Sequence, residues 1–386
     1  MVPSEIYHAK TLKGLEPLLA EELRALGAER VKAVKRGVNF QGGRALMYRV
    51  NLASRLSLRV LLPVLHFEAS DTELLYRKVK QFDWSVYLDH RMTFAVDPVV
   101  HSPHFRNSHF VAQKVKDAIA DRFTERTHLR PSVNREHPDL LINVHISGRL
   151  VTVSLDSSGG SLHKRGYRRG HFEAPLNEVL AAGMIHMTGW KGHTPFLDPM
   201  CGSGTVAIEA AMIATGIPPG IFREHFGFER WKDFDRELLE HVARELPGEK
   251  EVKVPIVARD VDRNAVKLVR EQLRSMDMQH LVTVEEADFA SSEGMEGATI
   301  VINPPYGERM NTADIDSLYS MMGSTLKHRF PDSDVWILSS SVSGLKNIGL
   351  RPASKKKLYN GSLECHFVNY KTFRGHWKDY KTHGNQ

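Results

Sequence analysis

An alternation of helix and strand patterns, which begins at Pro175, constrains the fold of this chain more than any other feature. Helical periodicity is predicted at 175–190, 205–215, 263–276 and 315–330, and strands at 194–198, 254–260, 281–288, 298–303 and 334–341, before a terminal hairpin near 355–370. Strands that alternate with helices form a parallel sheet covered on both faces. We therefore predict a Rossmann-like, doubly wound α/β domain that binds its ligand at the carboxyl ends of the strands.

The first strand of this domain ends in the stretch 196-FLDPMCGSGTVAIEAA-211. An acidic residue, Asp198, precedes the glycines Gly202 and Gly204, whose lack of side chains lets backbone amides approach a ligand. No Gly-Lys-Ser/Thr follows, so this is not an ATPase phosphate loop, and the third glycine of a dinucleotide fingerprint is replaced. A ligand that needs a carboxylate here is positively charged. S-adenosylmethionine fits, with its amino acid end facing Asp198.

Acidic residues also follow the second and third strands. Asp260 ends the second strand, where a ribose diol is expected, and Asp262 opens the next helix, either as a ligand contact or as an N-cap. Asp288 and Phe289 end the third strand and suit the exocyclic amine and ring face of an adenine. Three strand ends are thus assigned to one cofactor.

The fourth strand ends in Asn303-Pro304-Pro305-Tyr306, which we assign to the substrate. The exocyclic amine of a base is a poor nucleophile because its lone pair is delocalised into the ring. The Asn303 side chain and the Pro304 carbonyl are expected to hold the two amine hydrogens, and Tyr306 is expected to stack on a base drawn out of its helix. Prolines fix such acceptors rigidly, as catalysis by positioning requires.

The first half of the chain has a different charge and texture. Residues 1–170 carry 27 Lys and Arg against 17 Asp and Glu, whereas residues 171–386 carry 25 against 29. A strand at 6–9, a helix at 14–27 and a strand at 31–42 indicate half of a ferredoxin-like α+β unit, and a hairpin at 140–156 closes the region. The basic surplus favours a domain that binds a polyanion, against the alternative of a merely solvated surface.

A stretch rich in glycine, serine and basic residues, 157-SSGGSLHKRGYRRGHFEA-174, separates the two halves. Lys164, Arg165, Arg168 and Arg169 surround Tyr167, an arrangement that favours contact with RNA. A flexible interdomain tether with solvated charges is the alternative.

The ordered motifs Asp-Pro-x-Cys-Gly-Ser-Gly-Thr, Asp-x-Asp, Ala-Asp and Asn-Pro-Pro-Tyr-Gly-Glu-Arg resemble those of S-adenosylmethionine-dependent amino-methyltransferases. The stretches 164-KRGYRRG-170 and 174-APLNEVLAA-182 are similar to the subgroup with an N-terminal THUMP RNA-binding domain, and most similar to RlmL-type enzymes, which form N2-methylguanosine in 23S ribosomal RNA. The resemblance implies a ferredoxin-like segment at 1–44, a THUMP domain at 45–158, a basic linker at 159–174 and a methyltransferase domain at 175–386. Because the chain ends before a second methyltransferase domain, a single modification is expected.

The resemblance and the strand ends together give a set of expected site residues. The catalytic residues are expected to be Asn303, Pro304, Pro305 and Tyr306, and the RNA contacts Lys164, Arg165, Tyr167, Arg168 and Arg169. The cofactor-binding residues are expected to be Pro175, Leu176, Asn177, Asp198, Pro199, Met200, Cys201, Gly202, Ser203, Gly204, Thr205, Asp260, Val261, Asp262, Asp288, Phe289 and Asn303.

Three alternatives stay open on function: a guanosine-N2 methyltransferase of transfer RNA, an adenine-N6 methyltransferase of DNA, and a catalytically silent RNA-binding assembly factor. Only 80 residues follow Tyr306, which leaves no room for a C-terminal DNA-recognition domain, so target reading is expected from the basic half. No metal is expected, because His101, His104 and His109 match no common zinc spacing. With no apolar membrane segment and two cysteines, we expect a cytoplasmic protein. The 217–251 insertion has no assigned role.

Overall fold

The computed structural model describes residues 5–168, 175–305 and 312–374, which form two compact units. The N-terminal unit contains the residues up to 11, 19–164 and 223–246, and the C-terminal unit contains 12–18, 165–222 and the residues from 247 onward. Within the described ranges, no helix is both long and apolar enough to cross a membrane.

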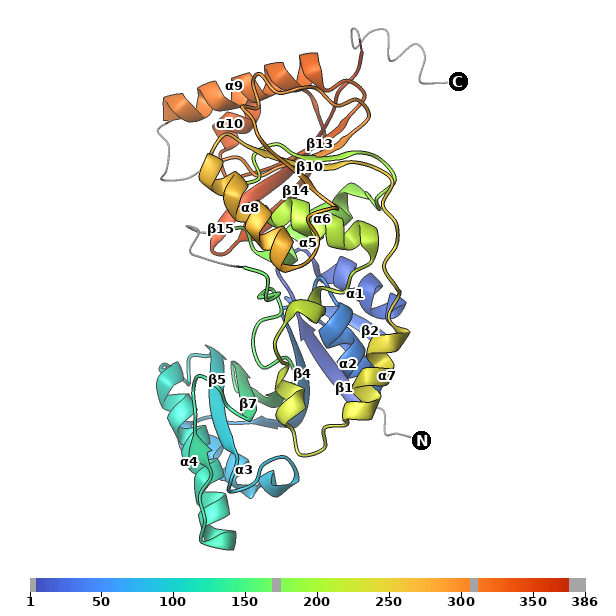
Figure 1. Ribbon diagram of the computed structural model, residues 1–386. Helices are drawn as coiled ribbons and strands as arrows, with labels where there is room; N and C mark the ends of the chain where they lie inside the picture. Colours follow the sequence, from blue (N-terminus) through green and yellow to red (C-terminus); the bar gives the residue numbers. More distant parts are fainter. Residues whose placement is uncertain (1–4, 169–174, 306–311, 375–386) are drawn as a thin grey trace. The chain divides into compact units, whose positions relative to one another are not determined.

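An eight-stranded sheet is the centre of the N-terminal unit, with strand order β2-β3-β1-β4-β8-β7-β5-β6 (Figure 1). Its strands are β1 (Glu5–Lys10), β2 (Glu29–Val34), β3 (Gly37–Gly42), β4 (Arg59–Glu68), β5 (Thr93–His101), β6 (Ser132–Val133), β7 (Leu140–Ser147) and β8 (Leu150–Asp156). Its helices are α1 (Glu16–Ala25, in this unit from Leu19), α2 (Arg44–Ala53), α3 (Thr72–Gln81), α4 (Ser108–Thr127) and α7 (Arg236–Glu245).

Strand β4 makes the ferredoxin-like and THUMP parts one continuous sheet, and the sequence patterns do not predict it. It pairs with β1 on one side and with β8 on the other. Pro63 lies in its middle, and proline normally argues against a central strand because it lacks an N–H. The pairing with β8 shifts register between Pro63 and Leu65, and such a bulge accommodates the missing donor.

The single strand predicted at 31–42 is instead the hairpin β2–β3. The turn between them has Arg36 at φ +59°, a left-handed conformation that arginine seldom adopts. No glycine or proline lies between the two strands to signal this turn, so the sequence pattern predicts one continuous strand.

The insertion between α6 and β10 leaves the C-terminal unit and packs within the N-terminal unit over residues 223–246. The ring of Phe228 stacks on Tyr48 of α2 with centroids 4.4 Å apart, and the Tyr48 hydroxyl accepts a hydrogen bond from the Asp235 N–H at 3.1 Å. Lys232 Nζ donates to the Ser85 carbonyl at 2.7 Å. The insertion therefore contacts both α2 and the segment that follows α3.

The C-terminal unit is a seven-stranded sheet with strand order β11-β10-β9-β12-β13-β15-β14. Its strands are β9 (Phe196–Asp198), β10 (Ile256–Asp260), β11 (Thr283–Glu286), β12 (Thr299–Ile302), β13 (Asp334–Ser339), β14 (Pro352–Asn360) and β15 (Leu363–Lys371). Its helices are α5 (Glu178–Thr188), α6 (Thr205–Thr215), α8 (Arg263–Ser275), α9 (Thr312–Arg329) and α10 (Val342–Asn347). The first five strands are parallel and β15 is antiparallel to β13, which confirms the Rossmann-like fold class.

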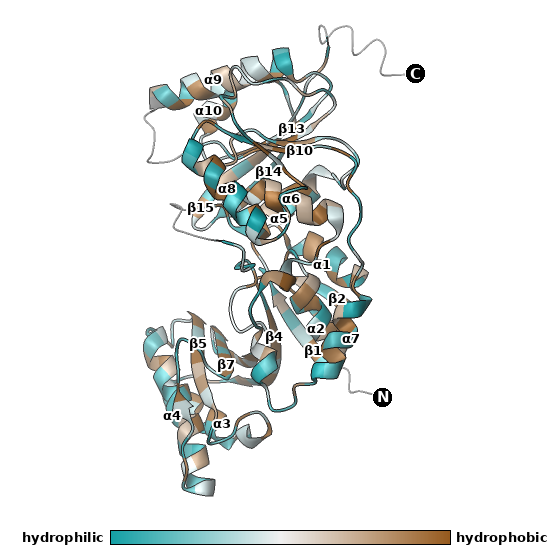
Figure 2. Cartoon of the chain, in the orientation of Figure 1, coloured by the Kyte–Doolittle hydropathy of each residue, from teal (hydrophilic) through white to brown (hydrophobic). Residues whose placement is uncertain are grey.

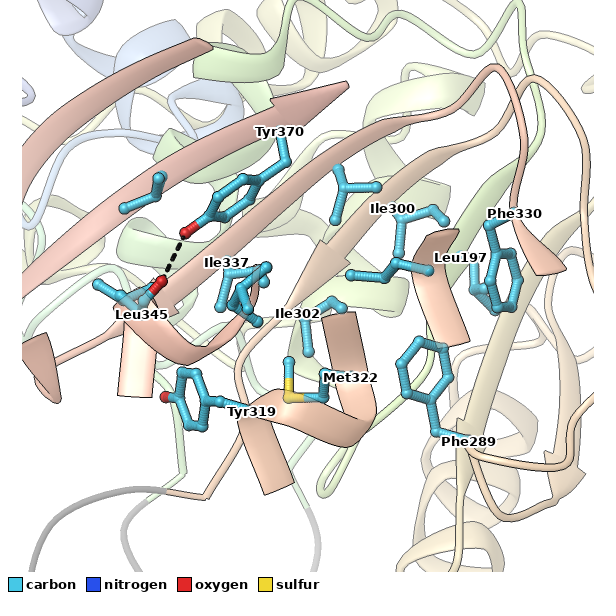
Figure 3. Close-up of a cluster of buried hydrophobic side chains, with 14 of the residues drawn as sticks. Leu197, Phe289, Ile300, Ile302, Tyr319, Met322, Phe330, Ile337, Leu345 and Tyr370 are labelled. Carbon is cyan, nitrogen blue, oxygen red and sulfur yellow. Dashed lines mark hydrogen bonds between the residues drawn. The ribbon is translucent and has the colours of Figure 1, made fainter. Parts of the chain in front are cut away.

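Helices α5, α6 and α8 lie on one face of this sheet, and α9 and α10 on the other (Figure 1). Figure 2 shows α6 coloured mainly as hydrophobic, in keeping with the burial of most of its side chains, whereas α8 exposes polar residues. The core beneath α9 brings together side chains from the strands and both helices (Figure 3). There the Tyr370 hydroxyl donates to the Leu345 carbonyl at 3.3 Å, which ties β15 to α10.

The strand order reverses at β9, which pairs with β10 on one side and β12 on the other. Ligands of open α/β sheets bind at the carboxyl ends of strands at such a switch point. This topology makes Asp198 and Asn303 neighbours, because Asp198 ends β9 and Asn303 directly follows β12.

Candidate active site

A pocket of about 1130 Å³ lies in the C-terminal unit at the carboxyl ends of the strands. Its lining residues that the sequence predicts are Pro175, Leu176, Asp198, Pro199, Met200, Cys201, Gly202, Ser203, Thr205, Asp260, Val261, Asp288, Phe289, Asn303, Pro304 and Pro305. Its volume exceeds the roughly 300–1,000 Å³ typical of pockets that bury one drug-sized ligand. The pocket therefore has room for a cofactor and for part of a second ligand.

The glycine turn after β9 is held in place by two neighbouring elements. Asp260 accepts hydrogen bonds from the Gly202 N–H at 2.8 Å and, through its other oxygen, from the Asp262 N–H at 2.9 Å. From α8, the buried Gln272 side chain donates to the Ser203 carbonyl at 3.0 Å. Asp260 thus positions the turn, and each of its oxygens keeps a lone pair that can accept from a ligand.

Asp198 is the most electrostatically perturbed carboxyl group of the pocket. It is buried, and neither of its carboxylate oxygens has a hydrogen-bond partner among the described residues. Burial, with a smaller contribution from the Asp260 carboxylate, raises the pKa of Asp198 to about 8. The N–H groups of Met200 and Ala207 partly offset this rise, although neither has the geometry of a hydrogen bond. A cationic ligand group would pair with this carboxylate.

Asn303 presents a second buried oxygen to the same pocket. Its Oδ1 has no hydrogen-bond partner within the described part of the chain. A buried acceptor left without a donor costs about 1–3 kcal/mol, so a ligand that donates to Asn303 would recover this free energy. Pro304 is buried and Pro305 is exposed, while Tyr306, the fourth residue of the motif, lies outside the described residues.

Three of the predicted cofactor contacts serve the scaffold and do not line the pocket. Asn177 caps α5 by accepting from the N–H groups of Val179 and Leu180, and Asp262 caps α8 by accepting from the Asn264 N–H. Gly204 adopts φ +75°, and a Cβ there would lie 2.7 Å from a Val269 methyl group. The absence of a side chain at Gly204 therefore permits close packing of α6 against α8.

The residues after β11 line the pocket and are held in place by contacts of their own. Asp288 lines the pocket, and its Oδ1 accepts from the Ala290 N–H at 3.0 Å. Phe289 is buried, lines the pocket and stacks on Phe330 with centroids 5.5 Å apart, as Figure 3 shows for its place in the core. Only part of this ring is therefore offered to a ligand.

The basic stretch is divided between the units: residues 157–164 belong to the N-terminal unit, and residues 165–168 are built into the C-terminal unit, which corrects the predicted role of two of them. Arg165 is 2% exposed and pairs with the buried Glu209, Nε to Oε1 at 3.1 Å, and Tyr167 is 3% exposed. Buried side chains cannot reach RNA, so the predicted RNA contacts of Arg165 and Tyr167 are wrong. The segment through Arg168 is also not a free tether.

Arg168 joins two walls of the pocket. Its guanidinium donates to the Leu176 carbonyl at 2.6 Å and to the Thr205 hydroxyl at 3.1 Å, and it pairs with Glu178 at 2.5 Å. These contacts hold the segment before α5 against the first turn of α6. Lys164 is exposed and keeps its predicted RNA contact as a hypothesis, whereas Arg169 lies outside the described residues.

Several pocket residues were not predicted from the sequence. They are Val206, Ala287, Leu318, Met321, Asn360, Gly361 and Leu363. Leu318 and Met321 come from α9, and the last three form the turn of the β14–β15 hairpin. An Asn-Gly pair between two strand patterns signals a turn, but its place at the pocket depends on the strand order, which the sequence patterns did not reveal.

Neither of the other reactive groups considered from the sequence forms a separate site. Cys201 lines the pocket, and burial raises the pKa of its thiol well above the ordinary value, so the neutral thiol dominates near pH 7. Across residues 5–168, 175–305 and 312–374, no group of three or more His, Cys, Asp and Glu side chains is placed to hold a metal ion.

Comparison with known families agrees with this geometry. Residues 165–369 match the methyltransferase domain described as RMKL-like, residues 69–156 match the THUMP domain, and residues 7–61 match the RlmL ferredoxin-like domain. The chain belongs to the RMKL-like methyltransferase family. Its N-terminal unit therefore combines a ferredoxin-like domain with THUMP, as the resemblance implied.

Curated relatives of this family cover most of the chain. A Synechocystis sp. protein named "Putative RNA methyltransferase slr0064" is 37% identical over 372 residues, which are 95% of this chain and 97% of the relative. The "Ribosomal RNA large subunit methyltransferase K/L" of Syntrophotalea carbinolica is 39% identical over 379 residues, 94% of this chain and 53% of the relative. The chain thus spans about half the length of its K/L relatives.

A solved structure of similar fold agrees with the cofactor that the residues of the pocket predict. SMU.472, crystallised in complex with SAH, aligns with a TM-score of 0.86 at 29% identity and covers 97% of this chain and all of its own. SAH is the product that S-adenosylmethionine leaves after methyl transfer. The Asp198 carboxylate, which has no partner among the described residues, suits its ammonium group, and the Gly202 turn allows its close approach. The cofactor of this RMKL-like methyltransferase is S-adenosylmethionine.

Proposed function

We propose that this protein transfers a methyl group from S-adenosylmethionine to the exocyclic N2 amine of a guanosine in 23S ribosomal RNA. The observation that carries the proposal is the buried Asn303 Oδ1, which lines the cofactor pocket and has no partner among the described residues. An exocyclic amine is a donor that fits this acceptor.

The cofactor supplies an electrophilic methyl group on a sulfonium. When held by Asp198 and the Gly202 turn, it would give this methyl group to the amine nitrogen and keep the S–C bond electrons on sulfur, as a neutral thioether. Asn303 Oδ1 and the Pro304 carbonyl accept the two amine hydrogens, which lets the nitrogen lone pair leave conjugation with the ring and point at the methyl carbon. These acceptors also stabilise the positive charge that grows on nitrogen, before the extra proton passes to solvent.

Rigid positioning is the second contribution of the chain. Pro304 and Pro305 fix the backbone directly after β12, and the buried strand ends at Ile302 without further ladder pairing. Asp198 holds the cofactor end of the pocket. The reacting atoms are thus brought together by two adjacent strands of one sheet, so little further ordering is needed in the transition state.

The choice of RNA and base rests on the relatives and on the N-terminal unit. The K/L relatives are named for the large ribosomal subunit, and the THUMP match lies in the half of the chain with the basic surplus. The names of these relatives favour ribosomal RNA over transfer RNA, and the THUMP match favours RNA over DNA. The choice of guanine N2 rests on the resemblance to RlmL-type enzymes, since the same acceptors could serve guanosine in transfer RNA or adenine N6 in DNA.

The test is a transfer assay with labelled S-adenosylmethionine on nucleic acid from cells that lack the protein. Ribosomal RNA, transfer RNA and DNA are assayed separately and hydrolysed for nucleoside mass spectrometry. N2-methylguanosine in 23S ribosomal RNA is the expected product. Label confined to transfer RNA would overturn the substrate, 6-methyladenine in DNA would overturn base and substrate, and no label in any pool would overturn the function.

A further inference from the structure

We propose that the β14–β15 hairpin is an RNA-binding element of the methyltransferase unit, with its turn forming one wall of the target-base site and its exposed lysines binding the flanking phosphates. This inference deepens the proposed function and rests on it. It also adds a second RNA contact region to the one expected from the N-terminal unit.

The pocket extends past the residues that a cofactor needs. Three acidic residues of the lining lie at the ends of neighbouring strands: Asp198 ends β9, Asp260 ends β10 and Asp288 comes shortly after β11. Across Asn303, the lining changes to Leu318 and Met321 of α9 and to the hairpin turn. The acidic side takes the cationic cofactor, which leaves the apolar side beyond Asn303 for the flat face of a base.

The turn itself offers an amide and an apolar side chain at the pocket. Asn360 and Leu363 are paired across the two strands, with Gly361 and Ser362 between them. Gly361 adopts φ +64°, while Ser362 does not have a positive φ, as expected for a two-residue turn of type II′. A Cβ at Gly361 would meet no atom of the described residues within 4 Å, so none of them crowds this side of the turn.

Exposed lysines continue from the turn along the outermost strand of the sheet. Lys355, Lys356 and Lys357 of β14 are all exposed. Lys357 pairs with Glu364 at 2.8 Å, whereas no ion pair is recorded for Lys355 or Lys356 within residues 5–168, 175–305 and 312–374. These two lysines carry the uncompensated positive charge of the strand.

The distance from turn to lysines suits a nucleotide and its neighbours. Lys356 precedes Asn360 by four residues, a rise of about 13 Å along a strand. Long lysine side chains at that distance reach phosphates on either side of a base held at the turn. The positive charge of the strand also acts on His366, which pairs with Lys357 across β14 and β15. Partial burial lowers the pKa of His366, and Lys355 lowers it further.

A competing explanation is that lysines on an outermost strand only prevent pairing with other sheets. That role would leave RNA affinity unchanged when two lysines are removed. The two explanations therefore differ in a measurable way that does not depend on methyl transfer.

The experiment compares the full-length double variant Lys355→Ala/Lys356→Ala with the control Lys191→Ala/Lys327→Ala. The control lysines are also exposed. Lys191 precedes β9 and Lys327 lies in the last turn of α9, so both lie toward the amino ends of the strands. Filter binding of fragmented 23S ribosomal RNA is measured over a range of salt concentrations. Two lost phosphate contacts should reduce the slope of log affinity against log salt by about 1.4–1.8, and the control should match the unmodified protein.

Ultraviolet cross-linking of the same RNA, followed by peptide mass spectrometry, tests the turn. Cross-links on the peptide that holds Asn360 to Leu363 are expected, together with unchanged affinity of the lysine variant for S-adenosylmethionine. An unchanged salt slope, or cross-links that spare this peptide, overturns the hairpin proposal. Hairpin-dependent binding without methyl transfer by the unmodified protein would support the hairpin and overturn the proposed function.

Discussion

Asp198 ends β9 and Asn303 directly follows the adjacent parallel strand β12, and each presents to one pocket a buried oxygen that has no partner in the described part of the chain. One is a carboxylate whose pKa burial has raised, and the other is a neutral amide. The pair divides the pocket into a place for a cation and a place for an amine. This division explains how one sheet edge holds both reactants of a methyl transfer.

The first prediction concerns the pH dependence of cofactor binding. With a pKa of about 8, Asp198 is mostly protonated at pH 7 in the free protein, and pairing with a cationic ammonium requires the proton to leave. The dissociation constant of S-adenosylmethionine should therefore fall up to about tenfold per unit between pH 6 and 8. Calorimetry in buffers of different ionisation enthalpy should detect proton release at pH 7, and Asp198→Asn should abolish it.

The same shift predicts the sign of a stability effect. Because the folded pKa lies above the ordinary value of 3.8, the free protein loses stability from this group as pH rises from about 4 to about 8. Asp198→Asn should flatten that loss in thermal unfolding. A variant with the same pH profile as the unmodified protein would show that Asp198 is charged throughout.

The second prediction concerns Gly204, which we assign to helix packing. Gly204→Ala places a Cβ 2.7 Å from Val269 and also strains a positive φ, whereas Gly189→Ala strains a similar φ of +78° with no atom within 4 Å. The free energy of unfolding should fall by about 1–3 kcal/mol more for Gly204→Ala than for Gly189→Ala. Equal losses in urea denaturation would mean that packing at Gly204 is unimportant.

The third prediction tests the corrected role of the basic stretch. Arg165→Ala leaves the Glu209 carboxylate buried without its ion-pair partner, which should cost about 3–5 kcal/mol of stability. Lys164→Ala, at the exposed neighbouring position, should change stability by less than about 0.5 kcal/mol. Both are measured by urea denaturation. A stable Arg165→Ala protein with weakened RNA binding would restore the original RNA-contact interpretation.

The fourth prediction concerns the insertion. Phe228 is buried and stacks on Tyr48, so Phe228→Ala should destabilise the N-terminal unit by about 3–5 kcal/mol. Because Phe228 lies outside the C-terminal unit that holds the pocket, the change should not alter the affinity for S-adenosylmethionine. Ile221→Ala, an exposed apolar position before the insertion leaves the C-terminal unit, is the control. Loss of cofactor binding in Phe228→Ala alone would contradict this assignment.

Local signals predicted the C-terminal unit well. Helix α6 runs from Thr205 to Thr215, as expected, because its start follows a glycine turn and its end meets Gly216. The acidic strand ends and Asn303 line one pocket, because a parallel sheet brings its strand ends to one edge whatever the details of packing.

Features that depend on distant partners were missed. Arg165 was interpreted as an RNA contact because its partner, Glu209, lies 44 residues away on α6. Strand β4 was missed because Pro63 argues against a central strand, and the register shift that accommodates this proline has no signature in the local sequence. The hairpin turn at Gly361 reaches the pocket only because β15 inserts between β13 and β14.

The central claim, that Asn303 Oδ1 activates the target amine, is tested most directly by Asn303→Ala beside the control Asn347→Ala, an exposed asparagine of α10. Single-turnover methyl transfer to 23S ribosomal RNA is measured with S-adenosylmethionine and RNA affinities on the same preparations. We predict a rate loss of about 10²–10³-fold or more for Asn303→Ala, with both affinities nearly unchanged and the control fully active. Ordinary turnover by Asn303→Ala would contradict the account.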